Sequence, residues 1–405
     1  MKTTFYKTNR IEFINALPEG SWSAIASHDQ LQGRGDVAFP FWQEPNFYYL
    51  TGLPDEPGAV LYLGKKKDGS PQAILVVTPR SKFTAQWSGQ DSLQDLQRKS
   101  GIEHVISSGD AVHTYSQILE TYDTLYITAP KPEDEMVENP ALRRLAYRLR
   151  RDKPTLLLKS ASSIFKKNRS IKKPEEIQTI QKAADISTKA FLALPKQIQS
   201  LDSERQVAQF FDYQCILHGG EQPAYTTIVA SGANGATIHH TGSFSMSNNQ
   251  LVLVDAATQF GQYAADITRT IPRGKPSKRQ KEVFEAVLSI QTDIIKHFTT
   301  ENSLQDIEKI TEELMREALK NLGLKTDGDN LRKYYPHAVS HHLGLEVHDV
   351  GGRSDKLQPN MVVTVEPGIY IPEEEIGVRI EDMIRITEKR PEILTANLPS
   401  RLGWD

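Results

Sequence analysis

Five residues in the carboxy-terminal half of the chain carry side chains that bind metal ions well. They are four carboxylates and one imidazole: Asp255, Asp266, His341, Glu366 and Glu381. Hard divalent cations prefer oxygen donors and accept an imidazole, and two cations a few ångströms apart need carboxylates that can bridge them. Each of the five lies in a strand-like apolar run, so the pattern predicts a hydrolytic site with two divalent metal ions.

The first two carboxylates belong to an expected β-hairpin. The run 250–254 predicts a buried strand that ends at Asp255, and the run 263–270 predicts a second strand that contains Asp266. Antiparallel pairing of these strands would bring the two carboxylates side by side in the interior. Buried carboxylates need partners or metal ions, and so this arrangement favours a bound cation.

The other three donors lie in the segments 336–351, 362–370 and 377–382. By type, order and spacing, all five donor positions resemble those of the pita-bread metallopeptidases, the family of methionine aminopeptidase, prolidase and aminopeptidase P. The resemblance extends from about residue 172 to about residue 387. It implies a domain with the pita-bread (creatinase/aminopeptidase) fold, in which two related α/β halves surround the metal ions.

The resemblance also implies a role for each donor. Asp255 would bind one ion, whereas Asp266 and Glu381 would bridge both. His341 and Glu366 would bind the second ion. A water or hydroxide between the ions would be the nucleophile, because coordination can lower the pKa of water from about 15.7 to about 7. Glu366 would also accept a proton from this water and pass it to the leaving amine.

Further residues match family positions around the substrate. His239 and His348 would donate hydrogen bonds to the scissile carbonyl or to the oxyanion. His337 and Arg379 would line the same pocket behind the ligands and orient ligands and substrate. Tyr225 either lines the pocket or packs within a strand. Packing alone is expected for two more histidines, His240 and His342.

The expected hairpin departs from the family pattern. Ala257, Gln262 and Ala265 stand where glycine is usual in the family, and Gly261 is left to form the turn. The spacing of the donors is intact, but the local geometry of the turn cannot be taken from the family.

Residues 1–165 alternate short β runs with helical patterns and predict an α/β domain with a mixed sheet. The segments 39–53 and 56–61 resemble the aminopeptidase P amino-terminal domain, which methionine aminopeptidase lacks. In that family the domain caps the cleft or reaches a neighbouring subunit, which implies a homodimer or homotetramer. Trp42, at a position often basic in relatives, weakens this expectation. The aromatic cluster could instead serve only the core of its own domain.

A basic stretch, 166–173, leads into the pita-bread catalytic domain, which is expected at residues 170–405. Pro174 suits the first turn of a helix, and Glu175 and Glu176 complement the helix dipole. We expect a solvated linker and a helix start here. A nucleic-acid-binding patch is disfavoured because no second basic patch supports it.

Composition excludes several classes of protein. The 405 residues suffice for two domains, and 48 basic against 51 acidic residues give a formal net charge of -3, which does not favour polyanion binding. Cys215 is the single cysteine, so an intrachain disulfide is impossible and a reducing compartment is favoured. No signal peptide or membrane-spanning stretch is recognisable. We expect a cytoplasmic protein without nucleic-acid or membrane partners.

Within the resembled family, aminopeptidase P is the best match. This implies an Xaa-Pro aminopeptidase, a hydrolase that releases the residue preceding proline from a peptide. An Xaa-Pro dipeptidase (prolidase) is the alternative, although the short connection between His348 and Glu366 is unlike the animal enzymes. A third hypothesis is a non-catalytic peptide-binding module. The presence of all five donors disfavours it. The donors favour two Mn²⁺ ions per chain, with Co²⁺ or Zn²⁺ as alternatives.

Overall fold

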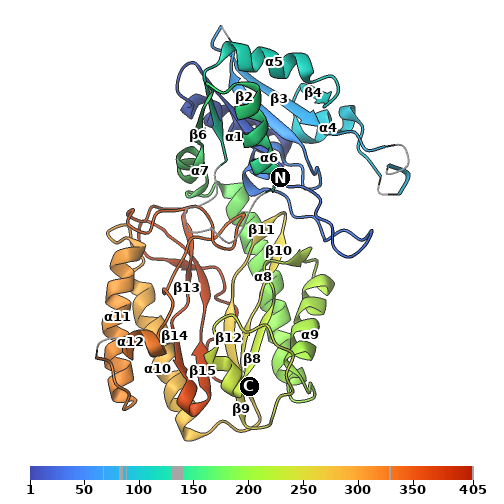
Figure 1. Ribbon diagram of the computed structural model, residues 1–405. Coiled ribbons are helices and arrows are strands. Elements are labelled where there is room, and N and C mark those ends of the chain that lie inside the picture. The colour runs from blue at the N-terminus through green and yellow to red at the C-terminus, as the bar shows by residue number, and fades with distance from the viewer. Residues whose placement is uncertain (67, 82–84, 88, 129–139, 328–329, 404–405) are drawn as a thin grey trace. The chain divides into compact units, whose positions relative to one another are not determined.

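The computed structural model describes residues 1–66, 68–81, 85–87, 89–128, 140–327 and 330–403 (Figure 1). The chain divides into two compact units, Met1–Asn168 and Arg169–Asp405, which we call the amino-terminal and the carboxy-terminal unit. The sequence pattern predicts a boundary between residues 165 and 170. Each unit contains a hydrophobic core of its own.

The amino-terminal unit is built on a mixed sheet with the strand order β4-β3-β2-β1-β5-β6. Its strands are β1 (Ser21–Ala26), β2 (Val60–Lys65), β3 (Pro71–Val77), β4 (His104–Ser107), β5 (Thr124–Ile127) and β6 (Leu157–Ser160). The central pairs β1–β2 and β2–β3 are antiparallel, whereas β3–β4, β1–β5 and β5–β6 are parallel. The mixed sheet expected from the sequence is therefore present.

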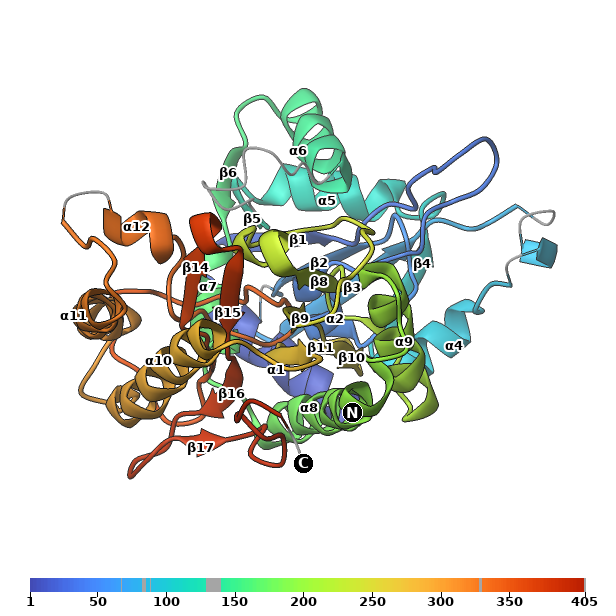
Figure 2. The same cartoon turned by 90° about the horizontal axis from the view of Figure 1, so that it is seen from below.

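Helices lie on both sides of this sheet. They are α1 (Thr3–Ala16), α2 (Pro45–Thr51), α4 (Leu93–Ser100), α5 (Val112–Thr121), α6 (Pro140–Asp152) and α7 (Ser162–Arg169). Trp22, Ala24 and Tyr62 on one face of the sheet pack with Ile118 of α5 and Leu145 of α6. Helix α1 lies on the opposite side (Figure 2).

The aromatic segment 39–53 divides between core and surface. Phe47 is fully buried in α2, and its backbone N–H donates to Glu44, which caps the helix. Phe39 and Trp42 are instead 59% and 43% exposed. The segment therefore serves the core of its own unit only in part.

The carboxy-terminal unit holds short strands between two groups of longer helices. The helices are α8 (Pro174–Gln197), α9 (Glu204–Leu217), α10 (Lys278–Ile294), α11 (Leu304–Asn321) and the short α12 (Asn330–Tyr334). Helices α8 and α9 lie on one side of the strands, and α10 and α11 lie on the other (Figures 1 and 2). Capping boxes at Ser277 and Ser303 define the starts of α10 and α11.

Within the described residues, the strands of this unit form four small sheets. Their orders are β11-β10-β7, β12-β9-β8, β13-β16-β17 and β14-β15. The bounds are β7 (Gln222–Pro223), β8 (Ile228–Ser231), β9 (Gln250–Asp255), β10 (Thr258–Phe260), β11 (Tyr263–Ala264), β12 (Thr268–Arg273), β13 (Val362–Val365), β14 (Gly368–Ile371), β15 (Ile376–Arg379), β16 (Asp382–Arg385) and β17 (Glu392–Ile393). Single 3₁₀ turns are η1 (Gly232–Ala236), η2 (Ile295–His297) and η3 (Pro372–Glu374).

Two strands from different sheets lie side by side and join the halves of this unit. Thr270 Oγ1 of β12 donates to the carbonyl oxygen of Arg379 in β15 at 3.0 Å. Just beyond β15, the backbone N–H of Glu381 donates to Thr268 O, also at 3.0 Å. A core made by Phe284 of α10, Ile307 of α11 and strand residues such as Val378 supports β15 from behind. The strand ends next to this junction therefore rest on a packed layer.

The expected hairpin between Asp255 and Asp266 is wrong in detail. Strand β9 pairs with β12, so that Thr268, and not Asp266, lies opposite Asp255. The residues between them form a separate small hairpin, β10–β11, whose turn holds Gly261 and Gln262 at φ values of 54° and 67°. Gln262 adopts this left-handed conformation although it is not a glycine. Asp266 consequently lies in the irregular connection before β12 rather than in a strand.

The basic stretch 166–173 is a solvated linker only in part, which corrects the expectation from the sequence. Arg169 and Lys172 are each 1% exposed, and both are paired with the buried Asp349. Burial of these cations is possible because the carboxylate compensates them, and Asp349 is too remote in the chain for local patterns to reveal it. The helix expected at Pro174 begins there as α8.

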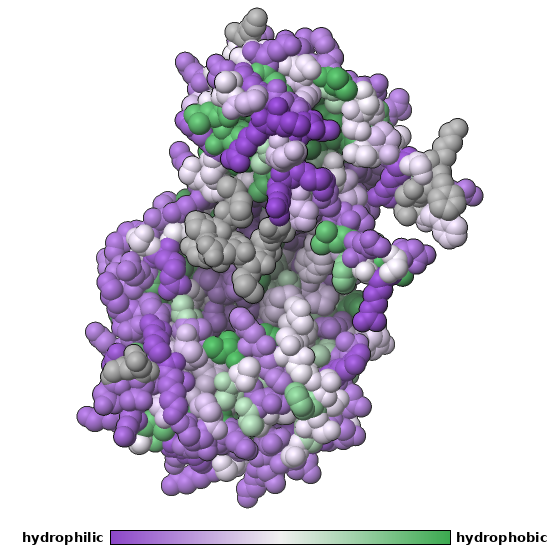
Figure 3. Space-filling model, viewed as in Figure 1, coloured by the Kyte–Doolittle hydropathy of each residue, from purple (hydrophilic) through white to green (hydrophobic). Residues whose placement is uncertain are grey.

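The surface agrees with the polar composition. The face shown in Figure 3 is mainly hydrophilic, with apolar residues scattered over it. Among the described residues, every helix is too short or too polar to span a bilayer.

Candidate metal centre

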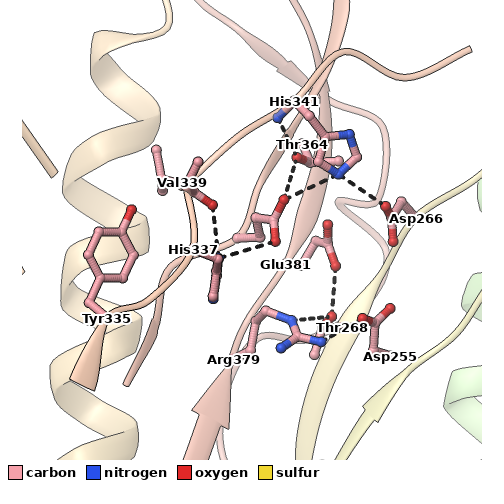
Figure 4. Close-up of polar contacts among 12 residues, drawn as sticks. Asp255, Asp266, Thr268, Tyr335, His337, Val339, His341, Thr364, Arg379 and Glu381 are labelled. Atoms are coloured by element: carbon pink, nitrogen blue, oxygen red, sulfur yellow. Dashed lines mark hydrogen bonds and ion pairs between the residues drawn. The ribbon is translucent and has the colours of Figure 1, made fainter. Parts of the chain in front are cut away.

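Three of the five expected donors form a compact cluster. Asp266, His341 and Glu381 each offer a ligand atom, and these atoms all lie within 4.8 Å of one another. Their side chains point toward one another from separate segments (Figure 4). Asp266 precedes β12, His341 lies in an irregular segment before β13, and Glu381 lies between β15 and β16. Donors distant in sequence thus reach one point.

The imidazole of His341 links this cluster to Glu366. Its Nε2 atom lies 3.3 Å from Asp266 Oδ2 and 3.2 Å from Glu366 Oε1. Its Nδ1 atom lies 3.1 Å from the carbonyl oxygen of His342, which can only accept a hydrogen bond. Nδ1 therefore carries a proton and Nε2 faces the carboxylates, which is the orientation in which an imidazole binds a metal ion.

Asp255 is held beside the cluster by Arg379 and Tyr225. Arg379 Nη2 donates to Asp255 Oδ2, and the Tyr225 hydroxyl donates to Oδ1, both at 2.5 Å. Arg379 Nε donates to Thr268 Oγ1 at 3.0 Å, and this hydroxyl donates to Glu381 Oε2 at 2.7 Å. Two side chains from adjacent strands therefore connect Asp255 to Glu381.

Burial and mutual repulsion change the titration of these carboxylates. Burial raises the pKa of Asp266 to about 6, and the charge of Asp255 adds to this rise. Burial and the neighbouring carboxylates also raise the pKa of Glu381 well above its usual value. Burial acts on Glu366 in the same direction, but the hydrogen bond with His341 and the electrostatic interactions with His341, His337 and Arg379 together outweigh it and lower the pKa to about 2. Carboxylates crowded in this way retain protons at a higher pH than usual. A divalent cation would displace these protons and bind the same carboxylate oxygens. The donor set therefore fits a divalent cation.

A second chain of hydrogen bonds leads from Asp255 through Arg379 to His337. Arg379 Nη1 donates to the Tyr370 hydroxyl at 2.7 Å, and this hydroxyl lies 2.7 Å from His337 Nε2. His337 Nδ1 lies 2.9 Å from the carbonyl oxygen of Ala338, so Nδ1 carries the proton and Nε2 accepts from Tyr370. Burial lowers the pKa of His337, which keeps this imidazole neutral.

Sequence reasoning missed Thr268 and Tyr370, which complete these two chains of hydrogen bonds. Both lie in segments with a strand pattern, and nothing in their residue type separates them from other strand residues. Position offers a weak signal for Thr268, which stands two residues after Asp266. In the strand expected over 263–270, residues two apart would share one face of the sheet.

The two histidines expected to contact the substrate lie in different surroundings. His348 is exposed, and its ring stands against that of His341 with centroids 4.4 Å apart and an interplanar angle of 84°. His239 is also exposed, on the turn that follows η1. Within the described residues, His239 makes no hydrogen bond or ring contact. The structure thus brings His348 to the donor cluster, whereas His239 has no hydrogen bond, ion pair or ring contact with the cluster in the described part of the chain.

The two histidines expected only to pack also differ. His342 is 5% exposed, and burial lowers its pKa to about 4, so it packs as a neutral ring. His240 does more than pack, because its Nε2 atom lies 2.9 Å from Oε2 of the buried Glu204.

Two regions of the chain match families of known proteins. Residues 178–388 match metallopeptidase family M24, and residues 6–126 match the amino-terminal domain of aminopeptidase P. Intermediate cleaving peptidase 55 of Saccharomyces cerevisiae is 34% identical over 95% of this chain and 79% of its own length. The Xaa-Pro aminopeptidase of Escherichia coli is 31% identical over 97% of this chain and 94% of its own.

Solved structures resemble the chain over almost its whole length. The crystal structure of Icp55 from Saccharomyces cerevisiae has a TM-score of 0.87 at 31% identity and covers 99% of this chain and 96% of that one. Aminopeptidase P from E. coli with the inhibitor Pro-Leu has a TM-score of 0.86 at 28% identity, with the same coverage. The predicted α/β fold, an aminopeptidase P-like domain followed by a pita-bread domain, is confirmed. The chain therefore belongs to metallopeptidase family M24, with the amino-terminal domain of aminopeptidase P, and is a metal-dependent hydrolase that acts on peptides.

Proposed function

We propose that this protein is an Xaa-Pro aminopeptidase, which removes the first residue of a peptide when proline is the second. The observation that carries the proposal is the convergence of Asp266, His341 and Glu381 within 4.8 Å. Relatives named Xaa-Pro aminopeptidase support this substrate class. The structure of aminopeptidase P with the inhibitor Pro-Leu supports it as well.

We assign two divalent metal ions to the site. The proposed ligands are Asp255, Asp266, His341, Glu366 and Glu381. Mn²⁺ is our first choice because a set rich in carboxylate oxygens suits it, and Co²⁺ and Zn²⁺ are the alternatives. Bound ions would act as Lewis acids and lower the pKa of water. The position of Asp266 and Glu381 in one cluster supports bridging roles for both.

Glu366 is the proposed proton carrier. Burial alone would raise its pKa, but the hydrogen bond with His341 and the electrostatic interactions with His341, His337 and Arg379 together lower the pKa to about 2, so the carboxylate is ionised at neutral pH. An ionised carboxylate can accept the proton of the attacking water and pass it to the leaving amine. Thr364 Oγ1 donates to Glu366 Oε1 at 3.1 Å and leaves Oε2 for this proton.

His348 and His239 are the proposed donors to the substrate carbonyl. The contact between the rings of His348 and His341 supports a location for His348 beside the metal ligands. An exposed imidazole can donate a hydrogen bond to the oxyanion that forms during hydrolysis. The hydrogen bonds already described support orienting roles for three further residues, His337, Arg379 and Tyr225.

Two series of peptides test the substrate class. With Mn²⁺, tripeptides of the form Xaa-Pro-Yaa should lose their first residue, and matched Xaa-Ala-Yaa peptides should resist. Cleavage restricted to Xaa-Pro dipeptides would identify the alternative, an Xaa-Pro dipeptidase. Uptake of metal without turnover of any of these peptides would contradict the proposal and favour a peptide-binding module.

The subunit number and the compartment are further proposals. A homodimer or homotetramer is supported by the exposed Phe39 and Trp42 of the amino-terminal unit, which offer apolar surface to a second copy. Size-exclusion chromatography with light scattering tests this, and a monomer at every concentration would exclude it.

The single cysteine supports a reducing compartment such as the cytoplasm. Because a relative in Arabidopsis thaliana is named a mitochondrial peptidase, cell fractionation must decide between cytoplasm and organelle.

A further inference from the structure

The buried carboxylate of Glu204 accepts five hydrogen bonds away from the metal centre. Glu204 is the first residue of α9, and its side chain is 0% exposed. Its Oε1 atom accepts from Ser231 N at 2.8 Å, from Ser231 Oγ at 3.0 Å and from Asn234 Nδ2 at 2.9 Å. Its Oε2 atom accepts from His240 Nε2 at 2.9 Å and from Phe244 N at 3.1 Å.

These donors belong to one segment, 231–244, which carries His239. The donors before His239 are Ser231 and Asn234, and those after it are His240 and Phe244. One carboxylate thus ties together the two ends of the segment. The backbone N–H of Glu204 adds a further bond, to Phe244 O at 3.0 Å.

The middle of the segment rests on strand β15. The backbones of Gly235 and Gly377 are so close that a Cβ atom built on Gly377 would lie 1.8 Å from the carbonyl oxygen of Gly235. Strand β15 ends at Arg379, which binds Asp255. The segment 231–244 is therefore held between Glu204 on one side and the strand behind the metal centre on the other.

The carboxylate of Glu204 is kept in its ionised form. Burial raises its pKa, but the hydrogen bonds from Asn234 and Ser231 outweigh burial, so the pKa lies below its usual value. An ionised carboxylate accepts from all these N–H and O–H groups. A glutamine amide would instead present its own N–H groups to the donors on one side.

We infer that Glu204 is a positioning residue for His239: by binding both ends of segment 231–244, it holds this imidazole where the substrate carbonyl arrives. The inference rests on the proposed function. Because His239 makes no hydrogen bond or ring contact within the described residues, its location depends on the backbone that carries it. A donor to the oxyanion must be fixed to be effective, since a misplacement of about 1 Å can cost about a hundredfold in rate.

The test compares Glu204→Gln with Asp212→Asn, a matched change of a carboxylate on the same helix. Asp212 accepts instead from Thr227 Oγ1, at 2.7 Å. With Mn²⁺ and an Xaa-Pro-Yaa peptide, Glu204→Gln should lower kcat about tenfold and leave KM nearly unchanged. Asp212→Asn should keep the wild-type kcat. Hydrogen–deuterium exchange in residues 231–244 should become faster in Glu204→Gln and not in Asp212→Asn.

A double-mutant cycle with His239→Ala separates positioning from general support of the fold. If Glu204 acts through His239, Glu204→Gln should lower kcat by less than about twofold once His239 is replaced. Equal losses with and without His239 would overturn the inference. Wild-type kcat and wild-type exchange in Glu204→Gln would overturn it as well.

Failure of the inference and failure of the proposed function give different results. A low kcat in His239→Ala with a wild-type kcat in Glu204→Gln would reject only the inference. No turnover of any Xaa-Pro peptide by the wild type would reject the proposed function and the inference with it.

If Glu204→Gln does not fold, His240→Ala removes one donor and repeats the cycle. Its expected loss of about threefold in kcat should disappear without His239, and persistence of that loss would overturn the inference.

Discussion

Lys172 Nζ donates to Asp349 Oδ2 at 2.9 Å, and the two side chains are 0% and 1% exposed. Arg169, whose side chain is 1% exposed, donates to the other oxygen of the same carboxylate. Arg169 also pairs with the partly buried Glu346 at 2.9 Å. One buried carboxylate therefore compensates two buried cations. Because Asp349 directly follows His348, this cluster also anchors the chain next to the metal centre.

Asp349→Ala should lower the free energy of unfolding by about 3–5 kcal/mol, because it removes the carboxylate that compensates the buried Lys172 and one of the two carboxylates that pair with the buried Arg169. Urea denaturation followed by circular dichroism measures this loss. Lys296→Ala is the control, since it removes a pair with Asp293 whose side chains are 67% and 50% exposed. The control should change stability by less than about 1 kcal/mol. A similarly small effect of both variants would contradict the assigned role of Asp349.

The same carboxylate should make stability depend on pH. Burial raises the pKa of Asp349, but the charges of Arg169 and Lys172 outweigh burial and lower the pKa from 3.8 to about 2. A pKa that is lowered on folding contributes stability that is fully present above the unfolded value and is lost as the pH falls through the folded value. The stability difference between the wild type and Asp349→Asn should therefore shrink by on the order of 2 kcal/mol between about pH 6 and pH 2. A difference that stays constant over this range would exclude the ionised cluster as its source.

Much of the fold follows from local patterns in the sequence. Apolar spacing predicts a helix over 304–322, and α11 spans Leu304–Asn321, starting where Ser303 forms a capping box. Local patterns do not predict which distant strands lie side by side. The bond from Thr270 Oγ1 to Arg379 O joins β12 to β15 across 109 positions of the chain, and neither segment carries a signal for the other.

The candidate site, like the fold, can be predicted from the sequence only in part. Residue type, order and spacing, together with the resemblance to the pita-bread metallopeptidases, select Asp266, His341 and Glu381, which the structure brings together. The residues that orient these donors have no pattern in the sequence that distinguishes them from other strand or helix residues. Thr268 gains its role only through Glu381, 113 positions away. The turn before Asp266 depends on a left-handed Gln262, a conformation that sequence pattern does not predict for this residue type.

Removal of one proposed bridging donor should abolish both turnover and stabilisation by metal. Asp266→Ala or Glu381→Ala takes one carboxylate from the cluster, so that two cations would be insufficiently shielded, and kcat should fall to less than about one hundredth. Mn²⁺ at about a hundred times its Kd should stabilise the wild type by about 2.7 kcal/mol and these variants by much less. Metal analysis, kcat and thermal unfolding with and without Mn²⁺ measure the three effects.

The control for these variants is Glu388→Ala, which removes an exposed carboxylate of the same unit. It should bind about two ions per chain and keep its turnover, as the wild type does. Substantial activity in Asp266→Ala or Glu381→Ala would contradict the bridging assignment. A wild type that takes up no Mn²⁺, Co²⁺ or Zn²⁺ would contradict the whole ligand set.

Thr268→Val should weaken metal binding although Thr268 is not a proposed ligand. Its hydroxyl accepts from Arg379 Nε at 3.0 Å and donates to Glu381 Oε2 at 2.7 Å, so valine keeps the shape but removes both bonds. Groups that orient metal ligands typically contribute about ten- to a hundredfold in affinity, and calorimetric titration with Mn²⁺ should find a loss in this range.

Thr311→Val is the matched control, because this threonine is equally buried and its hydroxyl donates to Ile307 O at 2.8 Å within α11. Both variants should lose some stability, but Thr311→Val should bind Mn²⁺ like the wild type. An equal loss of affinity in both would mean that general destabilisation, and not the orientation of Glu381, weakens the site.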